Sequence, residues 1–458
     1  VPDSDTAADW AQDPDDPYGG RKIRYPGWDL EALFTPAEIT TSAPITVAIA
    51  PDASLGVVSQ TLAAAQESIL IEGYTFESVA LYDVISKRLQ SGVAVTVLLE
   101  SNIVGGMADI EKWIVDRIDA SANGHAYFMD DEEEDLRRYR YQHAKFIVVD
   151  NKTALISTHN FNNRSRPVDR LDNGTGGHRG VVVVTEAPGV VARLQTLFAR
   201  DCDPTHHVDV IPYTDYGDNL APPDSYVPLP QPDWTTYTAV FSQPLVTTAS
   251  HLTVMHGPEH SLRATDALLG LLNQADSGDA IASLQLNEPL TWTHNVGVMG
   301  RNPRVQALVD AARRGATVRL LLDAYYDDPL DDNGNTATCL FLNDVADAEE
   351  LNLACRLANV TGLGIHAKAF LVDVGDEQWS HIGSINGSET SNKVNREVAL
   401  QFESKPAYDT LHQVFEHDWA RGHGPMIHRV HLPLVFRDYV APADYPLLTE
   451  IYINPPNP

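Results

Sequence analysis

Cysteine and lysine are both scarce in this sequence. Its three cysteines leave room for a single disulfide: Cys339 and Cys355 flank a predicted helix and are suitably placed, with Cys202 left over. Lysine occurs eight times, and 63 acidic residues against 32 basic ones give a net charge of −31. Such an acidic chain repels nucleic acid and anionic membranes at long range, although a local cationic pocket can still hold one phosphate. Acidity that serves only solubility is the simpler interpretation.

Long apolar runs and an initiator methionine are also missing. No stretch of 18 or more apolar residues occurs, so no transmembrane helix is predicted. The first residues, VPDSDTAADW, are typical of a mature N-terminus from which a leader has been removed. We therefore expect a secreted or cell-surface protein, and the low cysteine count is compatible with export.

Metal-ligand spacing is absent as well. No cluster of histidines and carboxylates has the spacing of a metal site, so we expect no metal and no other cofactor. The loop Asp327–Asn335, with the sequence DDPLDDNGN, has the acidic and glycine-containing character of a calcium loop. It lacks the full ligand spacing and the closing glutamate, so calcium remains a lesser alternative.

The chain is longer than one ordinary domain, and its pattern predicts a duplication. In the second half, LTVMHGP and RVQALVDAARRGATVRLLLDA repeat ITVAIAP and ALYDVISKRLQSGVAVTVLLES of the first half. We divide the chain into an acidic Pro-rich arm, a first repeat, a Pro- and Tyr-rich linker loop, a second repeat and a tail: residues 1–43, 44–205, 206–250, 251–424 and 425–458. We interpret the tail as the start of a truncated β domain.

Within each repeat, apolar strands alternate with amphipathic helices. The order β-α-β-α-β predicts a largely parallel or mixed sheet with helices on its faces. We therefore predict an α/β fold with two similar halves packed with pseudo-twofold symmetry and an active site at their seam.

Each half contains one copy of the same motif. The copies read YQHAKFIVVDNKTALISTHNF and GIHAKAFLVDVGDEQWSHIGSIN, and both contain His-Ala-Lys, four residues, Asp, an apolar run, a small polar pair and Asn. The repeated residues are His143, Lys145, Asp150 and Asn160 in the first copy and His366, Lys368, Asp373 and Asn386 in the second. One copy could arise by chance, but two copies in matched contexts are a specific signal.

These residue types suit the cleavage of a phosphodiester. The reaction needs a nucleophile, an acid for the leaving oxygen and positive charge around the phosphate. Residues i and i+2 of a strand point to one face, so each His and Lys pair would face one pocket. Two imidazoles, two ammonium groups and two amides would then surround one anion, and the coupled histidines would titrate as a pair.

The double pattern resembles the phospholipase D superfamily, whose signature H-x-K-x4-D-x6-G-S-x-N is usually present twice. The resemblance covers roughly residues 44–422 and implies His143 as the nucleophile that forms a phosphohistidine, with His366 as the acid and base. The further roles that it implies are phosphate binding by Lys145, Lys368, Asn160 and Asn386, hydroxyl support from Thr158 and Ser384, a mainly structural part for Asp150 and Asp373, and orientation of a histidine by Glu397.

The first half departs from this signature in two places. Ser157 and Thr158 stand where Gly and Ser are usual, and the strand that matches NRE of the second half reads HRG. Gly180 therefore occupies the position that corresponds to Glu397, and Asp172 in the preceding loop is a candidate substitute. The identity of the attacking histidine stays open for this reason.

We predict a metal-independent phosphodiesterase that hydrolyses a phospholipid to phosphatidic acid and a free headgroup, with headgroup exchange where an alcohol replaces water. The expected partners are a phospholipid and, transiently, a membrane or micelle surface; nucleic acid is less favoured, and no stable protein partner is implied. One alternative is an extracellular nuclease of the same superfamily, which the acidic charge disfavours. The other is a non-catalytic surface or structural protein built on a retired phospholipase D fold.

Overall fold

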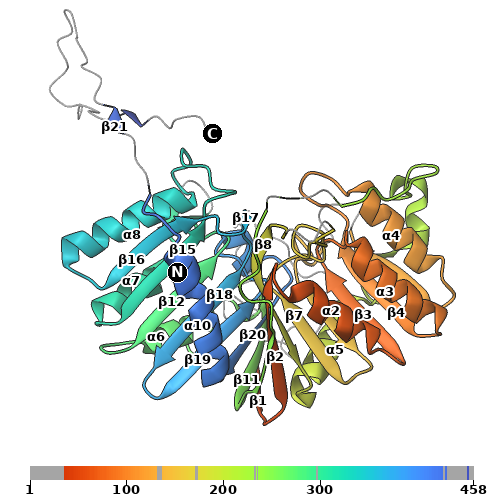
Figure 1. Ribbon diagram of the computed structural model, residues 1–458, viewed down its shortest axis with the longest axis horizontal. Coiled ribbons are helices and arrows are strands. Elements are labelled where there is room, and N and C mark those ends of the chain that lie inside the picture. The colour runs from red at the N-terminus through yellow and green to blue at the C-terminus, as the bar shows by residue number, and fades with distance from the viewer. Residues whose placement is uncertain are drawn as a thin grey trace, which may run out of the picture.

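Two helix-covered sheets stand next to each other in the computed structural model (Figure 1). The structure describes residues 36–130, 137–170, 174–231, 234, 236–294, 298–425, 429–430 and 451–452. The predicted tail, residues 425–458, falls almost wholly outside these ranges, as does Asp172, the candidate substitute for a carboxylate.

The first sheet is mixed, as predicted. Its strands, in spatial order, are β10 (Leu245–Thr248), β2 (Pro44–Ala50), β8 (Gly177–Thr185), β7 (Thr153–Ser157), β6 (Phe146–Val149), β3 (Ser68–Gly73), β4 (Ala94–Glu100), β5 (Gly124–Met129) and β9 (Val210–Pro212). β3, β4 and β5 run parallel, and the other neighbours along this order are antiparallel. The short β17 (Gly362–Ile365) of the second half adds to β8 in parallel.

The second sheet repeats this plan. Its strands, in order, are β1 (Ala37–Thr40), β11 (His251–Gly257), β20 (Glu397–Glu403), β19 (Glu377–Gly383), β18 (Lys368–Val374), β12 (Ala280–Gln285), β15 (Thr317–Asp323) and β16 (Leu353–Ala358). β12, β15 and β16 are its parallel strands. Two small hairpin pairs lie outside the sheets, β13 (Thr291–His294) with β14 (Val298–Arg301) and β21 (Arg429–Val430) with β22 (Ile451–Tyr452).

Three helices cover the outer face of each sheet, and one long helix per half packs on the inner side. The outer helices are α2 (Ser54–Ala63), α3 (Val79–Gln90) and α4 (Asp109–Asp119) in the first half and α6 (Leu268–Gln274), α7 (Pro303–Arg313) and α8 (Asn335–Glu349) in the second. The inner helices are α5 (Pro188–Asp201) and α10 (Lys405–Trp419), and the described residues also form the short elements α9 (Glu389–Lys393) and a 3₁₀ helix at Tyr213–Asn219.

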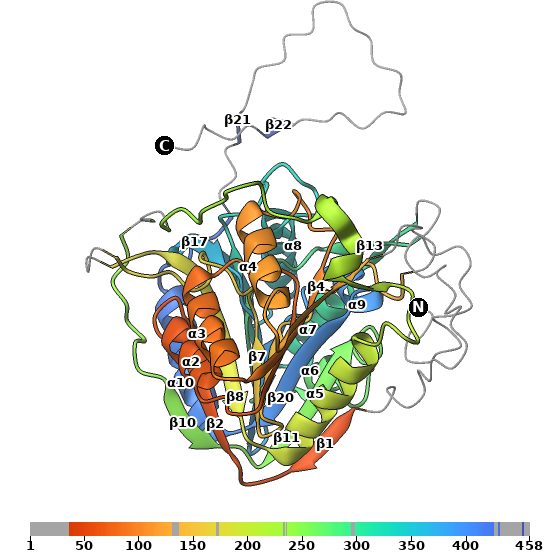
Figure 2. The ribbon, with the colours of Figure 1, turned by 90° about the vertical axis from the view of Figure 1, so that its right-hand side faces the viewer.

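The inner helices belong to a core that both halves share. This cluster contains Leu194 and Phe198 of α5 and Leu411 and Phe415 of α10, together with residues of β2, β8, β11 and β20. In Figure 2, β8 and β20 lie next to each other between the two layers of helices. Because burying this apolar surface requires both halves, the seam is part of the folding core rather than a loose contact.

Two corresponding ion pairs cross the seam, one on either side of the pseudo-twofold axis. Arg179 of β8 pairs with Asp418 of α10 at 2.8 Å, and Arg396, which directly precedes β20, pairs with Asp201 of α5 at 2.6 Å. All four side chains are almost completely buried. These pairs fix the two halves in one relative orientation.

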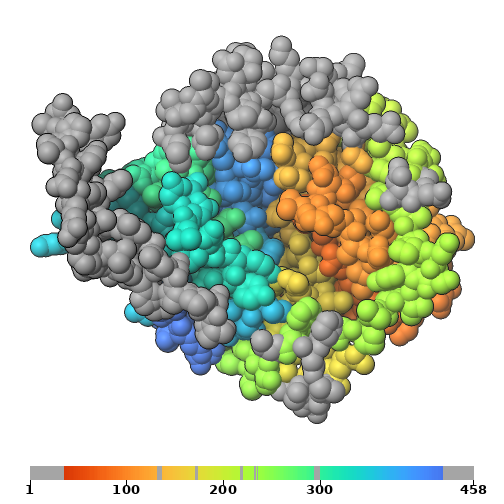
Figure 3. All heavy atoms as spheres, turned by 90° about the horizontal axis from the view of Figure 1, so that it is seen from above, coloured from red at the N-terminus to blue at the C-terminus, as the bar shows by residue number. Residues whose placement is uncertain are grey.

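Segments that the sequence assigned to the arm and the linker contribute edge strands. β1 joins the sheet of the second half, and β9 and β10 join the sheet of the first half. Cys339 of α8 and Cys355 of β16 form the expected disulfide, and Cys202 is free. Figure 3 shows the first half, in orange and yellow, meeting the second half, in teal and blue, in the middle of the molecule. The predicted α/β architecture of two similar halves is confirmed.

Candidate active site

The two His-Ala-Lys segments meet at the seam through backbone hydrogen bonds that cross it. The His143 amide donates to the Arg396 carbonyl at 2.9 Å, and the His366 amide donates to the Arg179 carbonyl at 2.8 Å. Each histidine precedes its strand, in an extended lead-in, instead of lying within the strand as the sequence suggested. Each motif is thus held by the strand region that follows the motif of the other half.

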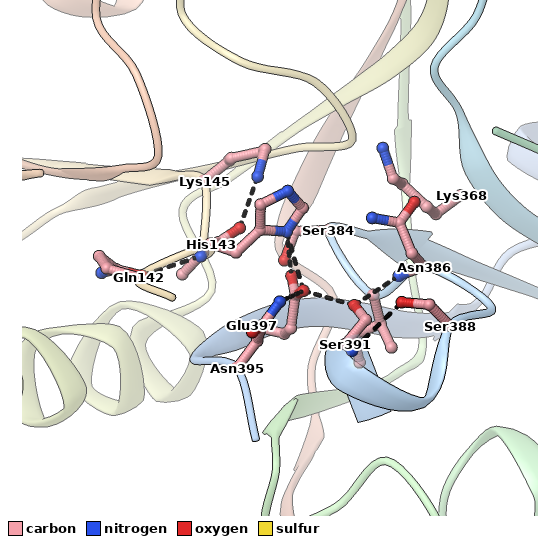
Figure 4. A network of polar contacts seen from close by, with 12 residues as sticks. Gln142, His143, Lys145, Lys368, Ser384, Asn386, Ser388, Ser391, Asn395 and Glu397 are labelled. Atoms are coloured by element: carbon pink, nitrogen blue, oxygen red, sulfur yellow. Dashed lines mark hydrogen bonds and ion pairs between the residues drawn. The ribbon is translucent and has the colours of Figure 1, made fainter. Parts of the chain in front are cut away.

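His143 is bound by a buried carboxylate. Its Nδ1 lies 2.8 Å and 2.9 Å from the two oxygens of Glu397, so Nδ1 carries the proton and donates, leaving Nε2 free to act (Figure 4). Tyr74 packs edge-on against the ring at 5.1 Å between centroids. Burial, opposed by the charge of Glu397, lowers the pKa of His143 to about 4, so the ring is neutral at pH 7.

Glu397 is itself fixed by donors from its own half. Ser391 Oγ donates to Oε1, and Asn395 Nδ2 donates to the same oxygen at 3.3 Å. Burial acts to raise the pKa of Glu397, but the charge and hydrogen bond of His143, the charge of Lys145 and a hydrogen bond from Ser384 outweigh it, so the pKa is lowered and the carboxylate stays charged.

Both motif lysines are buried in the site. Lys145 Nζ donates to the His143 carbonyl at 2.6 Å, and its pKa falls to about 7 because burial disfavours the charged form. Lys368 Nζ donates to the carbonyls of Thr158 and His366, each at 3.0 Å. Its pKa is lowered well below the usual value by burial and then by the charge of Lys145. An anion that enters the site would restore both charges.

His366 has surroundings unlike those of His143. Its Nδ1 lies 2.8 Å from Lys368 Nζ and 3.3 Å from the Thr158 carbonyl, and the ring of His178 stacks on it at 5.1 Å. Burial, then the charge of Lys368, lowers the pKa of His366 well below its usual value. The two histidines therefore differ in what faces Nδ1, the carboxylate of Glu397 in one case and the amino group of Lys368 in the other.

The motif asparagines lie where an anion could meet them. Asn160 lines the same cavity as His366, and Asn386 lies beside Lys368 in Figure 4. Both amide oxygens are buried and have no hydrogen-bond partner in the part of the chain that the structure describes. Since amide oxygen and nitrogen exchange places on a flip, each position can offer an N–H donor to phosphate.

The remaining motif residues make hydrogen bonds mainly to backbone groups. Thr158 Oγ1 accepts from the Val181 amide at 3.0 Å, and Ser384 Oγ accepts from the Val398 amide at 2.9 Å. The Asp150 carboxylate accepts from three consecutive amides, of residues 66–68, at 2.7 to 2.8 Å. Asp373 accepts instead from Gln378 Nε2 at 2.7 Å. The phosphate-binding part implied for Thr158 and Ser384 and the structural part implied for Asp150 and Asp373 stay predictions.

Sequence reasoning missed three side chains that lie close to His366. His159 and His178 are buried, and Tyr326, from the loop after β15, shares a hydrogen bond of 2.9 Å with His178 Nε2. His159 occupies the motif position of Ile385, so a comparison of the two copies, position by position, could have found it. Tyr326 belongs to no repeated pattern, and its place depends on the tertiary fold.

A cavity of about 780 Å³ opens beside His366 and Asn160. The acidic loop lines it with Asp327, Asp328 and Asp331, and Arg164 lies on the opposite half. The Asp327 carboxylate accepts from Thr336 Oγ1 at 2.5 Å and from its amide, which caps the start of α8. Among the described residues, no group of three or more His, Cys, Asp or Glu side chains is arranged to hold a metal ion.

A family model described as "Cardiolipin synthase, PLD-like domain" matches residues 58–202 and 269–419, which together make up more than half of the chain. The chain belongs to this family, within the phospholipase D superfamily. The two matched ranges correspond to the two halves, and each range contains one copy of the His-Ala-Lys motif. No curated protein sequence matches the chain significantly.

Solved structures resemble this chain at low sequence identity. Phosphatidylserine synthase from Haemophilus influenzae Rd KW20 is 14% identical, with a TM-score of 0.54 over 85% of this chain and 88% of that one. Nuc from Salmonella typhimurium, a phospholipase D family member, is 18% identical, with a TM-score of 0.29 over 37% of this chain and 98% of that one. Polyphosphate kinase from Porphyromonas gingivalis is 12% identical, with a TM-score of 0.45 over 81% of this chain and 50% of that one. Only the phosphatidylserine synthase of these three has a TM-score above 0.5, and at 14% identity that likeness concerns the fold alone.

Searching the described residues for a helix long and apolar enough to cross a membrane finds none.

Proposed function

We propose that this phospholipase D family member hydrolyses the headgroup ester of a phospholipid, without a metal ion, through a phosphohistidine on His143. The observation that carries the proposal is the hydrogen bond from His143 Nδ1 to the buried Glu397. It directs Nε2 at the site and stabilises the positive charge that develops on the ring when this nitrogen attacks phosphorus.

The first step forms one bond and breaks one. The lone pair of His143 Nε2 attacks phosphorus, and the bond from phosphorus to the headgroup oxygen breaks. His366, which takes up a proton when the anionic phosphate is bound, gives that proton to the departing oxygen. Lys145 and Lys368 balance the charge on the non-bridging oxygens.

The second step reverses these duties. His366, now neutral, removes a proton from water, and the hydroxide attacks phosphorus, so that phosphatidic acid leaves and His143 is regenerated. An alcohol in place of water gives headgroup exchange by the same route. All of these groups lie at one seam, which is the reason for preferring an active enzyme over a retired scaffold.

The test is choline release from phosphatidylcholine micelles with EDTA present, comparing the wild type with His143→Ala and His366→Ala. We expect release by the wild type and a loss in each variant on the order of 10²-fold or more. A phosphohistidine should be trapped in wild type quenched with alkaline denaturant, because its P–N bond is labile in acid, and should be missing from His143→Ala. Absence of release by the wild type contradicts the proposal for this headgroup.

The same three proteins should be assayed on single-stranded DNA. Cleavage of DNA without choline release assigns the chain to the nucleases of the superfamily. Silence of the wild type on both substrates, with no phosphohistidine, leaves the retired scaffold as the better account.

A further inference from the structure

The backbone follows the same course around the site in both halves, and this allows position-by-position comparison. In the first sheet Gly180 pairs with Ala50, and in the second Glu397 pairs with Gly257; each partner directly precedes a proline. The amides of the two catalytic histidines bond to the residues just before Gly180 and Glu397. Gly180 is therefore the structural counterpart of Glu397.

Other side chains fill the space beside Gly180, where a carboxylate corresponding to Glu397 would lie. A Cβ atom on Gly180 would lie 2.9 Å from His159 Nδ1 and 2.9 Å from Thr158 Oγ1, closer than such contacts allow. His159 is fully buried, with Nδ1 at 3.1 Å from Ser157 Oγ. An imidazole thus occupies the position where the other half holds a carboxylate.

We propose that His159 makes the two catalytic histidines unequal: by taking the place of the corresponding carboxylate, it leaves His366 without an anionic partner, so that this ring takes up its proton only when a substrate phosphate supplies negative charge. His159 is a positioning residue in this scheme, because it acts through its neighbours. The inference rests on the proposed function only in one respect: the phosphate is taken to be that of the phospholipid substrate.

The groups around His366 support this assignment. Lys368 Nζ lies 2.8 Å from its Nδ1, His178 stacks on its face, and Lys145 and His159 lie close enough to disfavour a further positive charge. No carboxylate contacts the ring among the described residues. The Thr158 carbonyl, 3.3 Å from Nδ1, is the acceptor available when that nitrogen becomes protonated.

His143 provides the contrast within the same molecule. It faces Lys145 and Lys368 as well, but its Nδ1 donates to Glu397, whose negative charge opposes the effect of burial. His143 is thereby prepared to become a positively charged phosphohistidine, whereas His366 remains a neutral ring until an anion arrives. The division of labour between nucleophile and acid follows from two positions at which the halves differ, His159 and Gly180.

The experiment replaces residues of the first half by those at the corresponding positions of the second half. The double variant His159→Ile with Gly180→Glu gives the first half the residues that the second half has at these positions, Ile385 and Glu397. Thr158 needs no change, because its counterpart Ser384 already occurs together with Glu397 in the second half. Histidine rings labelled with ¹⁵N are titrated by NMR in the protein without substrate, which needs no activity. We expect the pKa of His366 to rise by about one to three pH units in the double variant.

The single variant His159→Ile is the matched control, because it removes the imidazole without supplying a carboxylate; its His366 should move far less. In the wild type, sulfate at saturating concentration should raise the pKa of His366. A folded double variant whose His366 titrates as in the wild type overturns the proposal.

A second variant covers the case in which the double variant does not fold. Glu397→Gln keeps the shape of the side chain and removes its charge, so the pKa of His143 should fall toward that of His366. If His143 and His366 already titrate together in the wild type, or if Glu397→Gln leaves His143 unmoved, the carboxylate is not what separates them. These readouts stay valid if the phospholipid assignment fails, since they use no lipid.

Discussion

At the scale of single residues, the two motif aspartates have diverged although their sequence positions correspond. Asp150 binds three consecutive backbone amides at the turn between α2 and β3, while Asp373 accepts from one side chain, Gln378. An aspartate that accepts from several amides satisfies donors that would otherwise lack a partner, so its loss costs more than the loss of a single surface contact.

Asp150→Asn should therefore reduce the free energy of unfolding by about 1–3 kcal/mol, measured by urea unfolding at pH 7. The amide hydrogens lower the pKa of Asp150 in spite of partial burial, so its contribution is present above the unfolded pKa of about 4 and is lost as the pH falls through the folded value. The difference between wild type and Asp150→Asn should shrink at low pH. Asp373→Asn is the control, and an equal loss there would contradict this account.

Lys145 gives the site a pH-dependent affinity for anions. Because burial lowers its pKa to about 7, the free site loses a positive charge above neutrality. Sulfate binding measured by calorimetry should weaken on the order of tenfold between pH 6.5 and 8.0, since binding then requires uptake of a proton. Lys145→Met should bind sulfate more weakly and with a smaller pH dependence than the wild type, because the proton uptake by Lys145 is removed. A flat profile in the wild type would mean that Lys145 stays charged in the empty site.

At the scale of elements, the position of the active site depends on pairs that join β8 to α10 and the start of β20 to α5. Arg179→Met removes one member of a buried pair and leaves Asp418 charged inside the core. We expect a loss of about 3–5 kcal/mol in urea unfolding, because an uncompensated buried charge is costly. Arg313→Met is the control, because Arg313 and its partner Glu349 are 43% and 40% exposed, and it should cost about 0–1 kcal/mol.

Most of the elements could be predicted from the sequence, because a strand or helix depends on nearby spacing. The alternation of apolar residues placed α3, α7 and the central strands close to their observed positions. The edge strands β1, β9 and β10 were missed, because each is three or four residues long and lies in Pro-rich surroundings. Only the partner strand supplies their hydrogen bonds, and that partner is distant in the sequence.

At the scale of the whole molecule, we expect the net charge of −31 to determine which lipid surfaces the protein binds. At 20 mM salt the protein should bind vesicles of phosphatidylcholine several-fold more tightly than vesicles that also contain anionic phosphatidylglycerol, because like charges repel at long range. Raising the salt to 300 mM shortens the screening length and should reduce this preference. Co-sedimentation measures both; stronger binding to the anionic vesicles at low salt would show that a local cationic patch dominates.

The sequence by itself determined the superfamily and the duplication and predicted which residues would surround an anion, because two copies of His-x-Lys in matched contexts rarely arise by chance. Only the tertiary structure decided which carboxylate serves which histidine, since Glu397 reaches His143 across the seam and over 254 positions of sequence. It also showed that His159 fills the place beside Gly180, which no spacing rule could reveal. Local sequence patterns show which side chains are available for the chemistry. The electrostatic field at an active site, however, is the sum of the contributions of all the groups that folding brings together.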